Sequence, residues 1–285
     1  MEVVLKILSF AFSALSALAF CTPTTSAQPT FGVPLSSYSL LVEDVWGIAP
    51  DSSVWKWNGN SWFEPNLAAK LRQISVGVGE VWGTTSNDHV WKWNGNSWFE
   101  PNSAAVLAQV SVGRGKTPSA GEVWGIGVNQ SVWRWNGNSW YEPNPGAVMY
   151  QISAGSHENL WAVGAGNHIY KWVAGSWVEP DVSARGWQVA ASFKTQAVWK
   201  LGTIGVFDTY PIFKNAGSGW FEPNSAAAAS QLSARSGKRA WAIGANYRVF
   251  STSNGGSSWE EPNPAAGLKQ VSVGYTQLYH GFATF

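Results

Sequence analysis

The sequence predicts an all-β fold, a six-bladed β-propeller of four-stranded antiparallel blades. Three observations support this fold class: a Trp-rich phrase that recurs, constant intervals between shared phrases, and no long stretch of helical periodicity after residue 27. The 285 residues include 20 Trp, 30 Gly and 14 Pro, and only 12% of them are charged. This composition is typical of a protein rich in strands and turns.

The most regular phrase is "VWKWNGNSWFEPN", which occupies residues 54–66 and recurs unchanged at 90–102. It returns as "VWRWNGNSWYEPN" at 132–144. A looser form that ends in Glu-Pro occurs six times, at intervals of 36, 42, 37, 43 and 39 residues, with its carboxylates at Glu64, Glu100, Glu142, Glu179, Glu222 and Glu261.

Each repeat contains four short apolar or aromatic runs, of the types "QISVG", "VWG", "VWKW" and "SWFEP". The interval from the Glu to the centre of the next "QISVG" run is always eleven residues. Length changes fall in Gly-rich or Pro-rich stretches such as "RGKTPSAG" at 114–121. Constant intervals indicate strands and variable ones indicate loops, so each repeat predicts one four-stranded propeller blade.

The two ends of the repeat array complement each other. The last copy ends before any "VWKW" run, whereas the segment that starts near residue 37 lacks a preceding "SWFEP" run. We expect the N-terminal and C-terminal segments to pair within one blade and so close a ring of six blades. A seven-bladed ring with one short blade is the alternative.

Residues 1–27 have the pattern of a secretory signal peptide. An apolar stretch covers residues 7–20, and the small residues Thr25 and Ala27 precede a possible cleavage site. An uncleaved membrane anchor is the alternative, but it needs about 20 apolar residues, more than the stretch 7–20 provides. A lipoprotein signal at Cys21 is a further alternative. We expect a secreted, extracellular protein with a signal peptide at 1–27, an N-terminal segment at 28–36 and a propeller at 37–285.

Charge and cysteine content narrow the function classes. The formal net charge is +1, and no run of Lys or Arg occurs, which disfavours nucleic acid and anionic membranes as partners. Cys21 is the sole cysteine, so the predicted mature chain has no disulfide and no thiolate metal site. We expect a neutral partner and no membrane insertion.

The repeated pattern "QISVG", "EVWG", "VWKWNGNSW" resembles the tectonin repeats of a family of β-propeller lectins. The resemblance covers residues 37–285, although the family's usual "IPG" is replaced here by "FEPN", "YEPN" or "VEPD". It implies carbohydrate binding, with O-methylated sugars or lipopolysaccharide as ligands and innate defence as a role. It also implies multivalent recognition of microbial or animal cell surfaces through similar sites between neighbouring blades.

The repeats themselves separate scaffold from candidate site residues. The Trp of "VWG" and the Trp of "SWFEP" occur in all six copies and are expected to be structural. The second aromatic of "VWKW" is Trp in four copies, but Asn215 and Thr252 replace it in the last two. The following Asn-Gly-Asn turn is intact in the first three copies.

A Trp face can pack against the C–H face of a sugar, and an adjacent Asn can bond its hydroxyls. The alternative is that Asn-Gly is simply a favoured hairpin turn. The candidate carbohydrate-binding residues are Trp57, Asn58, Asn60, Trp93, Asn94, Asn96, Trp135, Asn136, Asn138 and Trp172.

The Glu of "SWFEP" follows a basic residue by eight positions in five of the copies, as Glu64 follows Lys56. We expect a structural ion pair between the two, and a polar sugar pocket is the alternative interpretation.

Sequence motifs of an enzyme are missing. The four His occupy unmatched positions, and no spacing of His, Asp or Glu indicates a metal site or a catalytic pair. We therefore expect no enzymatic activity and no cofactor. The rival to the lectin hypothesis is a non-enzymatic protein-interaction propeller, and the oligomeric state stays open.

Overall fold

The structure is a computed structural model that describes residues 39–117, 121–215, 217 and 219–279. These described residues belong to one compact unit. The predicted signal peptide at 1–27 and the N-terminal segment at 28–36 lie outside the described residues, so both stay predictions.

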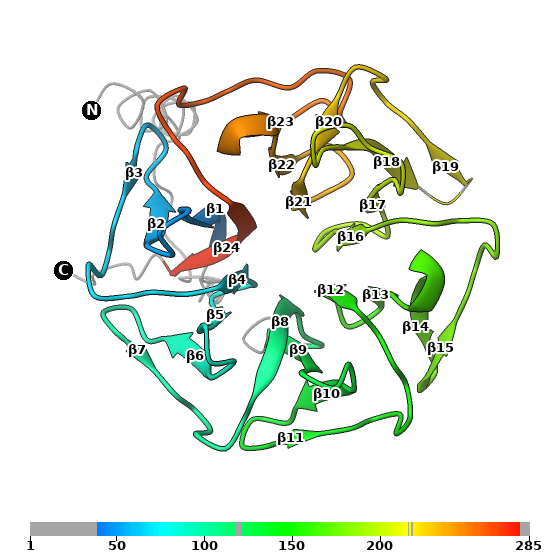
Figure 1. Cartoon of the computed structure of the whole chain (residues 1–285). Helices are drawn as coiled ribbons and strands as arrows, with labels where there is room; N and C mark the ends of the chain where they lie inside the picture. The colour runs from blue at the N-terminus through cyan, green and yellow to red at the C-terminus, as the bar shows by residue number, and fades with distance from the viewer. Residues whose placement is uncertain (1–38, 118–120, 216, 218, 280–285) are drawn as a thin grey trace, which may run out of the picture. The chain divides into compact units, whose positions relative to one another are not determined.

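The predicted all-β class is confirmed. In the described ranges the regular structure is β-strand, apart from two single-turn 3-10 segments, η1 (Ala165–Asn167) and η2 (Ala245–Tyr247). Successive strands pair antiparallel in chain order, as consecutive hairpins do. Figure 1 shows the resulting sheets standing around a central axis, each with its first strand nearest the axis.

Each sheet begins at the axis with the strand of a "QISVG" phrase and continues outward through the other three runs. The sheets formed within single repeats are β4 (Gln73–Val76), β5 (Val81–Thr84), β6 (Val90–Trp93) and β7 (Trp98–Phe99); β8 (Leu107–Arg114), β9 (Gly121–Gly127), β10 (Val132–Trp135) and β11 (Trp140–Tyr141); β12 (Gln151–Ser156), β13 (Asn159–Val163), β14 (Ile169–Val173) and β15 (Ser176–Val178); β16 (Gln188–Ala191), β17 (Val198–Leu201), β18 (Tyr210–Asn215) and β19 (Trp220–Phe221), with β20 (Ala228–Ala229) beside β18; and β21 (Gln231–Ala234), β22 (Ala240–Ile243) and β23 (Val249–Thr252). A single parallel pair, Arg114 with Ser156, joins β8 to β12.

The remaining sheet combines both ends of the described chain. Its order is β24 (Gln270–Tyr279), β1 (Ser39–Ile48), β2 (Val54–Trp57) and β3 (Trp62–Phe63). β1 and β24 are antiparallel and pair over their whole length, from Ser39 with Tyr279 to Ile48 with Gln270. This is the pairing of terminal segments that the complementary ends of the repeat array predict.

Glutamine side chains link each innermost strand to the next one. The Gln151 carboxamide accepts the Val189 N–H at 3.0 Å and donates its own N–H to the Val189 carbonyl at 3.1 Å. A planar amide can do this because it carries a donor and an acceptor at the spacing of a peptide group. The Gln of every "QISVG" phrase accepts a backbone N–H of the next innermost strand, in the pairs Gln73–Val110, Gln109–Ile152, Gln151–Val189, Gln188–Leu232, Gln231–Val271 and Gln270–Ile74.

The serine and glycine of the same phrase serve the same junction. The Ser111 hydroxyl accepts the Ala154 N–H at 2.8 Å, and Ser75 does so for Val112 at 2.9 Å. At Gly113 an added Cβ would lie 2.7 Å from the Ala154 carbonyl oxygen, so a side chain there would push the two strands apart. The Gln, Ser and Gly of "QISVG" thus recur because the innermost strands approach each other closely.

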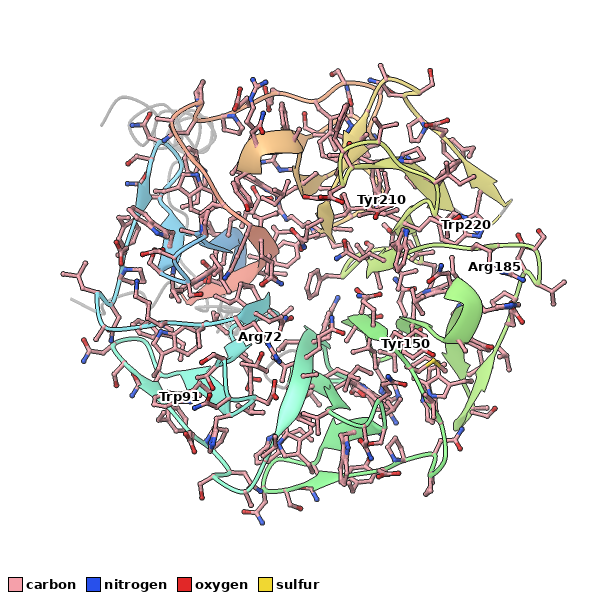
Figure 2. All side chains as sticks on the ribbon, in the orientation of Figure 1. Arg72, Trp91, Tyr150, Arg185, Tyr210 and Trp220 are labelled. Atoms are coloured by element: carbon pink, nitrogen blue, oxygen red, sulfur yellow. The ribbon has the colours of Figure 1, made fainter. Side chains whose placement is uncertain are left out.

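The core lies between neighbouring sheets and is dominated by the Trp of "VWG". Trp46, Trp82, Trp124, Trp199 and Trp241 are 0–1% exposed, which confirms that this set is structural. Trp46, for example, belongs to one apolar cluster with Leu71 and Ile74 of the following repeat. Figure 2 shows side chains filling the spaces between sheets, and the labelled Trp220 packs against Trp161 at a centroid distance of 6.4 Å.

The axis of the ring leaves little room. The cavity lined by the innermost strands has a volume of about 60 Å³. At one mouth, Val78, Phe193 and Tyr275 pack together as a small buried cluster. Burial raises the pKa of the Tyr275 hydroxyl, and Arg235, stacked on its ring at 4.4 Å, opposes that shift. A polypeptide cannot thread an axis of this size.

The glutamine links predict a specific stability loss. Gln151→Leu removes both bonds to Val189 and leaves a backbone N–H and carbonyl unpaired, which costs about 2 to 3 kcal/mol. Urea unfolding followed by Trp fluorescence measures this loss, with the exposed Gln196→Ala as control. Equal midpoints for the two variants would show that the carboxamide links add nothing to stability.

Candidate functional site

The four predicted Trp residues lie half-buried in the outer part of the junctions between sheets. Trp57 packs against Trp62 of its own hairpin at 5.4 Å and against the buried Trp241 of another repeat at 6.0 Å. The same contact to a buried Trp recurs in three further pairs, Trp93–Trp46, Trp135–Trp82 and Trp172–Trp124, at 5.6, 5.7 and 5.2 Å. These residues therefore contribute to inter-sheet packing, whatever else they bind.

Three of the predicted Asn residues are engaged in their own turns. The side-chain oxygen Oδ1 of Asn58 accepts the N–H groups of Asn60 and Ser61, and its side-chain nitrogen Nδ2 donates to the Ser61 hydroxyl. Asn94 and Asn136 make the same three bonds. Gly59 follows with φ of +99°, which suits glycine. This geometry agrees with the hairpin-turn interpretation; the second Asn of each turn, Asn60, Asn96 and Asn138, is exposed.

The expected ion pair between Glu64 and Lys56 is wrong. Lys56 is bonded instead to Asp44, at 3.2 Å. The reason is the register: Lys56 lies opposite Phe63 on one side, so the next residue, Glu64, points to the other face of the hairpin. On its other side Lys56 lies opposite Trp46, and Asp44, two residues from Trp46, shares that face.

A carboxylate, a Trp and a cation form a repeated network in three copies. Asp44 accepts the Trp46 indole N–H at 2.9 Å and pairs with Lys56, whose ammonium lies 4.9 Å from the Trp46 ring centroid. The other two copies have the same arrangement, namely Glu80–Trp82–Lys92 and Glu122–Trp124–Arg134. The acidic residue two positions before Trp in "EDVWG" and "EVWG" is the sequence signal for this network.

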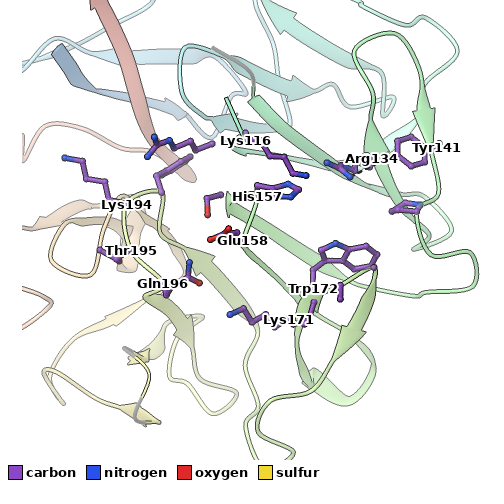
Figure 3. A pocket seen from close by; sticks show the side chains of 18 residues that line it. Lys116, Arg134, Tyr141, His157, Glu158, Lys171, Trp172, Lys194, Thr195 and Gln196 are labelled. Atoms are coloured by element: carbon purple, nitrogen blue, oxygen red, sulfur yellow. Dashed lines mark hydrogen bonds between the residues drawn. The ribbon is translucent and has the colours of Figure 1, made fainter. Parts of the chain in front are cut away.

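A cavity of about 1140 Å³ forms a cleft between the β8–β11 sheet and the β12–β15 sheet. We call it the 3/4 cleft, after the third and fourth Glu-Pro repeats. Its wall is formed by the hairpins after β8, β12, β14 and β16 together with β10 and β11; the described lining residues include Arg114, Lys116, Arg134, Tyr141, His157, Glu158, Lys171, Trp172, Lys194 and Thr195. Figure 3 shows Trp172 and Tyr141 on one side of this hollow and Glu158 and Lys194 on the other.

Of the ten predicted site residues, Trp172 alone lines the 3/4 cleft. The other nine lie at other hairpins, and their role in binding stays a prediction. The charged and aromatic groups that accompany Trp172 come from segments far apart in sequence. Several of these groups lie in the "RGKTPSAG" insertion or in the hairpins of the two following sheets. Such positions are not shared between repeats, so a comparison of the repeats does not identify them.

The charges in the cleft differ in how they are paired. Arg134 is bonded to Glu122 at 2.9 Å and donates to the Tyr141 hydroxyl at 3.3 Å. His157 approaches the other oxygen of Glu122 at 3.3 Å. Lys171 lies 5.6 Å from the Trp161 ring centroid, and no carboxylate of the described residues lies within 4.0 Å of its ammonium.

The neighbouring sheet contains two further lysines, the buried Lys200 and the half-buried Lys214. Burial lowers the pKa of Lys200, with Asp181 opposing and Arg185 adding to the shift, and its ammonium donates to the Arg185 carbonyl at 2.8 Å. Burial likewise lowers the pKa of Lys214, which donates to the Gly237 carbonyl. A second, smaller cavity of about 220 Å³ lies between β18 and β23 and is mainly apolar, with Phe250 and Trp259 in its wall.

The described residues were also considered for a metal site and for a membrane-spanning helix. Within the described ranges, no group of three or more His, Cys, Asp or Glu side chains is placed to hold a metal ion. Nor does that part of the chain contain a helix of the length and apolarity needed to cross a bilayer.

Comparison with known families gives a match to part of the repeat array. The model of the tectonin domain matches residues 39–118. The resemblance drawn from the repeated phrases is thereby confirmed for this segment, and related phrases recur after residue 118. A search of curated proteins finds no match to the chain.

Solved structures share the propeller fold at low identity. A mutant of the Aleuria aurantia lectin in complex with alpha-methyl-L-fucoside is 14% identical, with a TM-score of 0.52 over 79% of this chain and 93% of the lectin. A mutant of AofleA from Arthrobotrys oligospora is 13% identical, with a TM-score of 0.54 over 84% and 90%. A GH74 enzyme from Niastella koreensis is 12% identical with a TM-score of 0.50, and the match spans 76% of this chain and 43% of the enzyme.

The packing of the Trp residues at the junctions between sheets predicts that they contribute to stability. Trp135→Ala removes the contacts to Trp82 and Trp140 and is expected to lower the free energy of unfolding by about 2 kcal/mol. Trp187→Ala, at a half-exposed Trp outside these junctions, should cost less. Urea unfolding of both variants checks this. An unchanged midpoint for Trp135→Ala would return that residue to a role in ligand binding alone.

Proposed function

We propose that this chain is a carbohydrate-binding protein, a six-bladed tectonin propeller that binds glycans at hollows between blades. The observation that carries the proposal is the 3/4 cleft, in which the half-buried Trp172 and the exposed Tyr141 face a wall of polar groups. Aromatic faces beside hydrogen-bonding groups are what a sugar requires. The fucoside in the structurally similar Aleuria aurantia lectin supports the same function.

The count of six blades rests on the glutamine links. The series starts at Gln73 and returns through Gln270 to Ile74, the residue next to its origin, after six steps. The shared sheet of β1 and β24 occupies one step of this series. Both observations favour six blades over the seven-bladed alternative.

Our proposal includes the finer expectations from the sequence. The protein is secreted, lacks enzymatic activity, and recognises neutral or O-methylated glycans, or lipopolysaccharide, on microbial or animal cell surfaces, with a role in innate defence. Weak sites held on one rigid ring gain avidity together, because the second contact forms at a high effective concentration. The hollows are not equivalent: the cavity beside Phe250 and Trp259 is smaller and more apolar than the 3/4 cleft.

A glycan array tests this function. We expect the mature protein to bind surface glycans, among them O-methylated sugars or lipopolysaccharide, with an apparent Kd about 100 times lower than for the matching soluble monosaccharide. Tyr141→Ala should weaken binding at the 3/4 cleft, whereas the control Trp187→Ala should leave it unchanged. Failure to bind any glycan, combined with capture of one polypeptide at unit stoichiometry, would replace the lectin with a protein-interaction propeller.

A further inference from the structure

The 3/4 cleft contains more positive than negative charge, although the net charge of the whole chain is only +1. Its described lining includes one carboxylate, that of Glu158. It also includes five cationic side chains: Arg114, Lys116, Arg134, Lys171 and Lys194. The charge of Arg134 is balanced by Glu122 behind it. For the other four cations, no carboxylate within the described ranges lies within 4.0 Å.

The repeats provide an internal comparison for Lys171. The corresponding Lys56 and Lys92 are paired with Asp44 and Glu80, at 3.2 and 2.9 Å. In the repeat of Lys171 the position of that acid is held by Asn159. The Asn159 oxygen still accepts the Trp161 indole N–H at 2.8 Å, so the structural bond is kept while the countercharge is lost.

Asn159 also connects the cleft to the next hairpin. Its amide nitrogen donates to the carbonyls of Ser192, Thr195 and Ala197. That hairpin presents Lys194 to the cleft wall. A carboxylate at position 159 could not donate these bonds, so the substitution that leaves Lys171 unpaired also fixes the segment that presents Lys194.

We propose that the 3/4 cleft binds an anionic glycan, a sugar chain that bears sulfate, phosphate or carboxylate groups. This inference rests on the proposed carbohydrate-binding function and assigns its acidic ligands, lipopolysaccharide among them, to this one cleft, in place of the neutral ligand that the overall charge indicates. Trp172 and Tyr141 offer the apolar face for a ring, while Lys116, Lys171 and Lys194 offer charge to its acidic substituent. The cleft is partly open to solvent, so binding weakens as salt screens these charges.

Matched polymers test the proposal. Binding of the full chain to dextran sulfate, phosphorylated mannan and polygalacturonate is compared with binding to dextran and unmodified mannan at about 0.15 M salt, where screening is physiological. We expect at least one anionic polymer to bind about ten times more tightly than its neutral counterpart, and this ratio to fall as salt rises. Which acidic polymer binds best identifies the substituent.

Charge-matched variants locate the site. The double variant Lys116→Gln/Lys171→Gln should lower affinity for the preferred anionic polymer about tenfold and leave affinity for neutral glycans unchanged. The control Lys70→Gln/Lys269→Gln removes the same charge from the loops before β4 and β24, whereas the cleft residues lie in hairpins after innermost strands and on β14. Urea unfolding verifies that both double variants remain folded.

Three results would overturn the inference. Equal losses for the two double variants would mean that net charge, not the cleft, attracts the polymer. Binding of inorganic polyphosphate as tight as that of the anionic glycan would mean that the cleft holds anions without recognising sugar. Binding to neutral array glycans with no gain from any acidic group would remove this inference and leave the lectin function standing, whereas silence toward every glycan removes both.

Discussion

The closed ring depends on a carboxamide that acts as a substitute for a peptide group. The first strands of neighbouring sheets diverge around the axis, and the parallel pairs between them are single ones, Arg114 with Ser156 and, just after β4, Val78 with Tyr275. Their inward edges would therefore leave backbone groups unpaired in a narrow, buried space. Gln151 and its equivalents satisfy those groups, and the neighbouring Ser hydroxyls satisfy more. Because this interaction draws the strands to the axis until about 60 Å³ is left, the axis has no room for a sugar chain.

The sequence predicted what the repeats share. The invariant eleven-residue interval placed the innermost strands, and the burial of Trp46 and Trp82 agrees with their presence in every copy. Pairing of the terminal segments followed from their complementary phrases. The ion pair of Lys56 with Glu64 was predicted wrongly because spacing along the chain does not show on which face of the hairpin a side chain lies. Lys56 lies opposite Phe63, and this register places Glu64 on the other face.

Sequence reasoning found less of the candidate site, because a site made by differences between copies cannot be found by comparing what the copies have in common. Trp172 was identified through its recurrence, yet Lys116 and Lys194 belong to hairpins whose length and residues vary from copy to copy. The Trp residues present in four of the six copies, such as Trp57, also make contacts between sheets. Their absence from the last two copies therefore reflects a junction with fewer aromatic contacts as much as the absence of a ligand. At the junction where Asn215 replaces Trp, the buried Trp161 is left with Trp220 as its indole neighbour.

A propeller of near-identical repeats can acquire one distinctive site through a single change in charge. The acid of the repeated network has two partners, an indole N–H and a cation, and an amide can replace it for the first partner only. At Asn159 this replacement keeps Trp161 in place, and the new N–H donors hold the following hairpin through three carbonyls. The fold therefore loses no buried bond, while Lys171 loses the countercharge that its equivalents Lys56 and Lys92 retain. Ligand preference can thus change at one junction without disturbing the ring that the glutamines close.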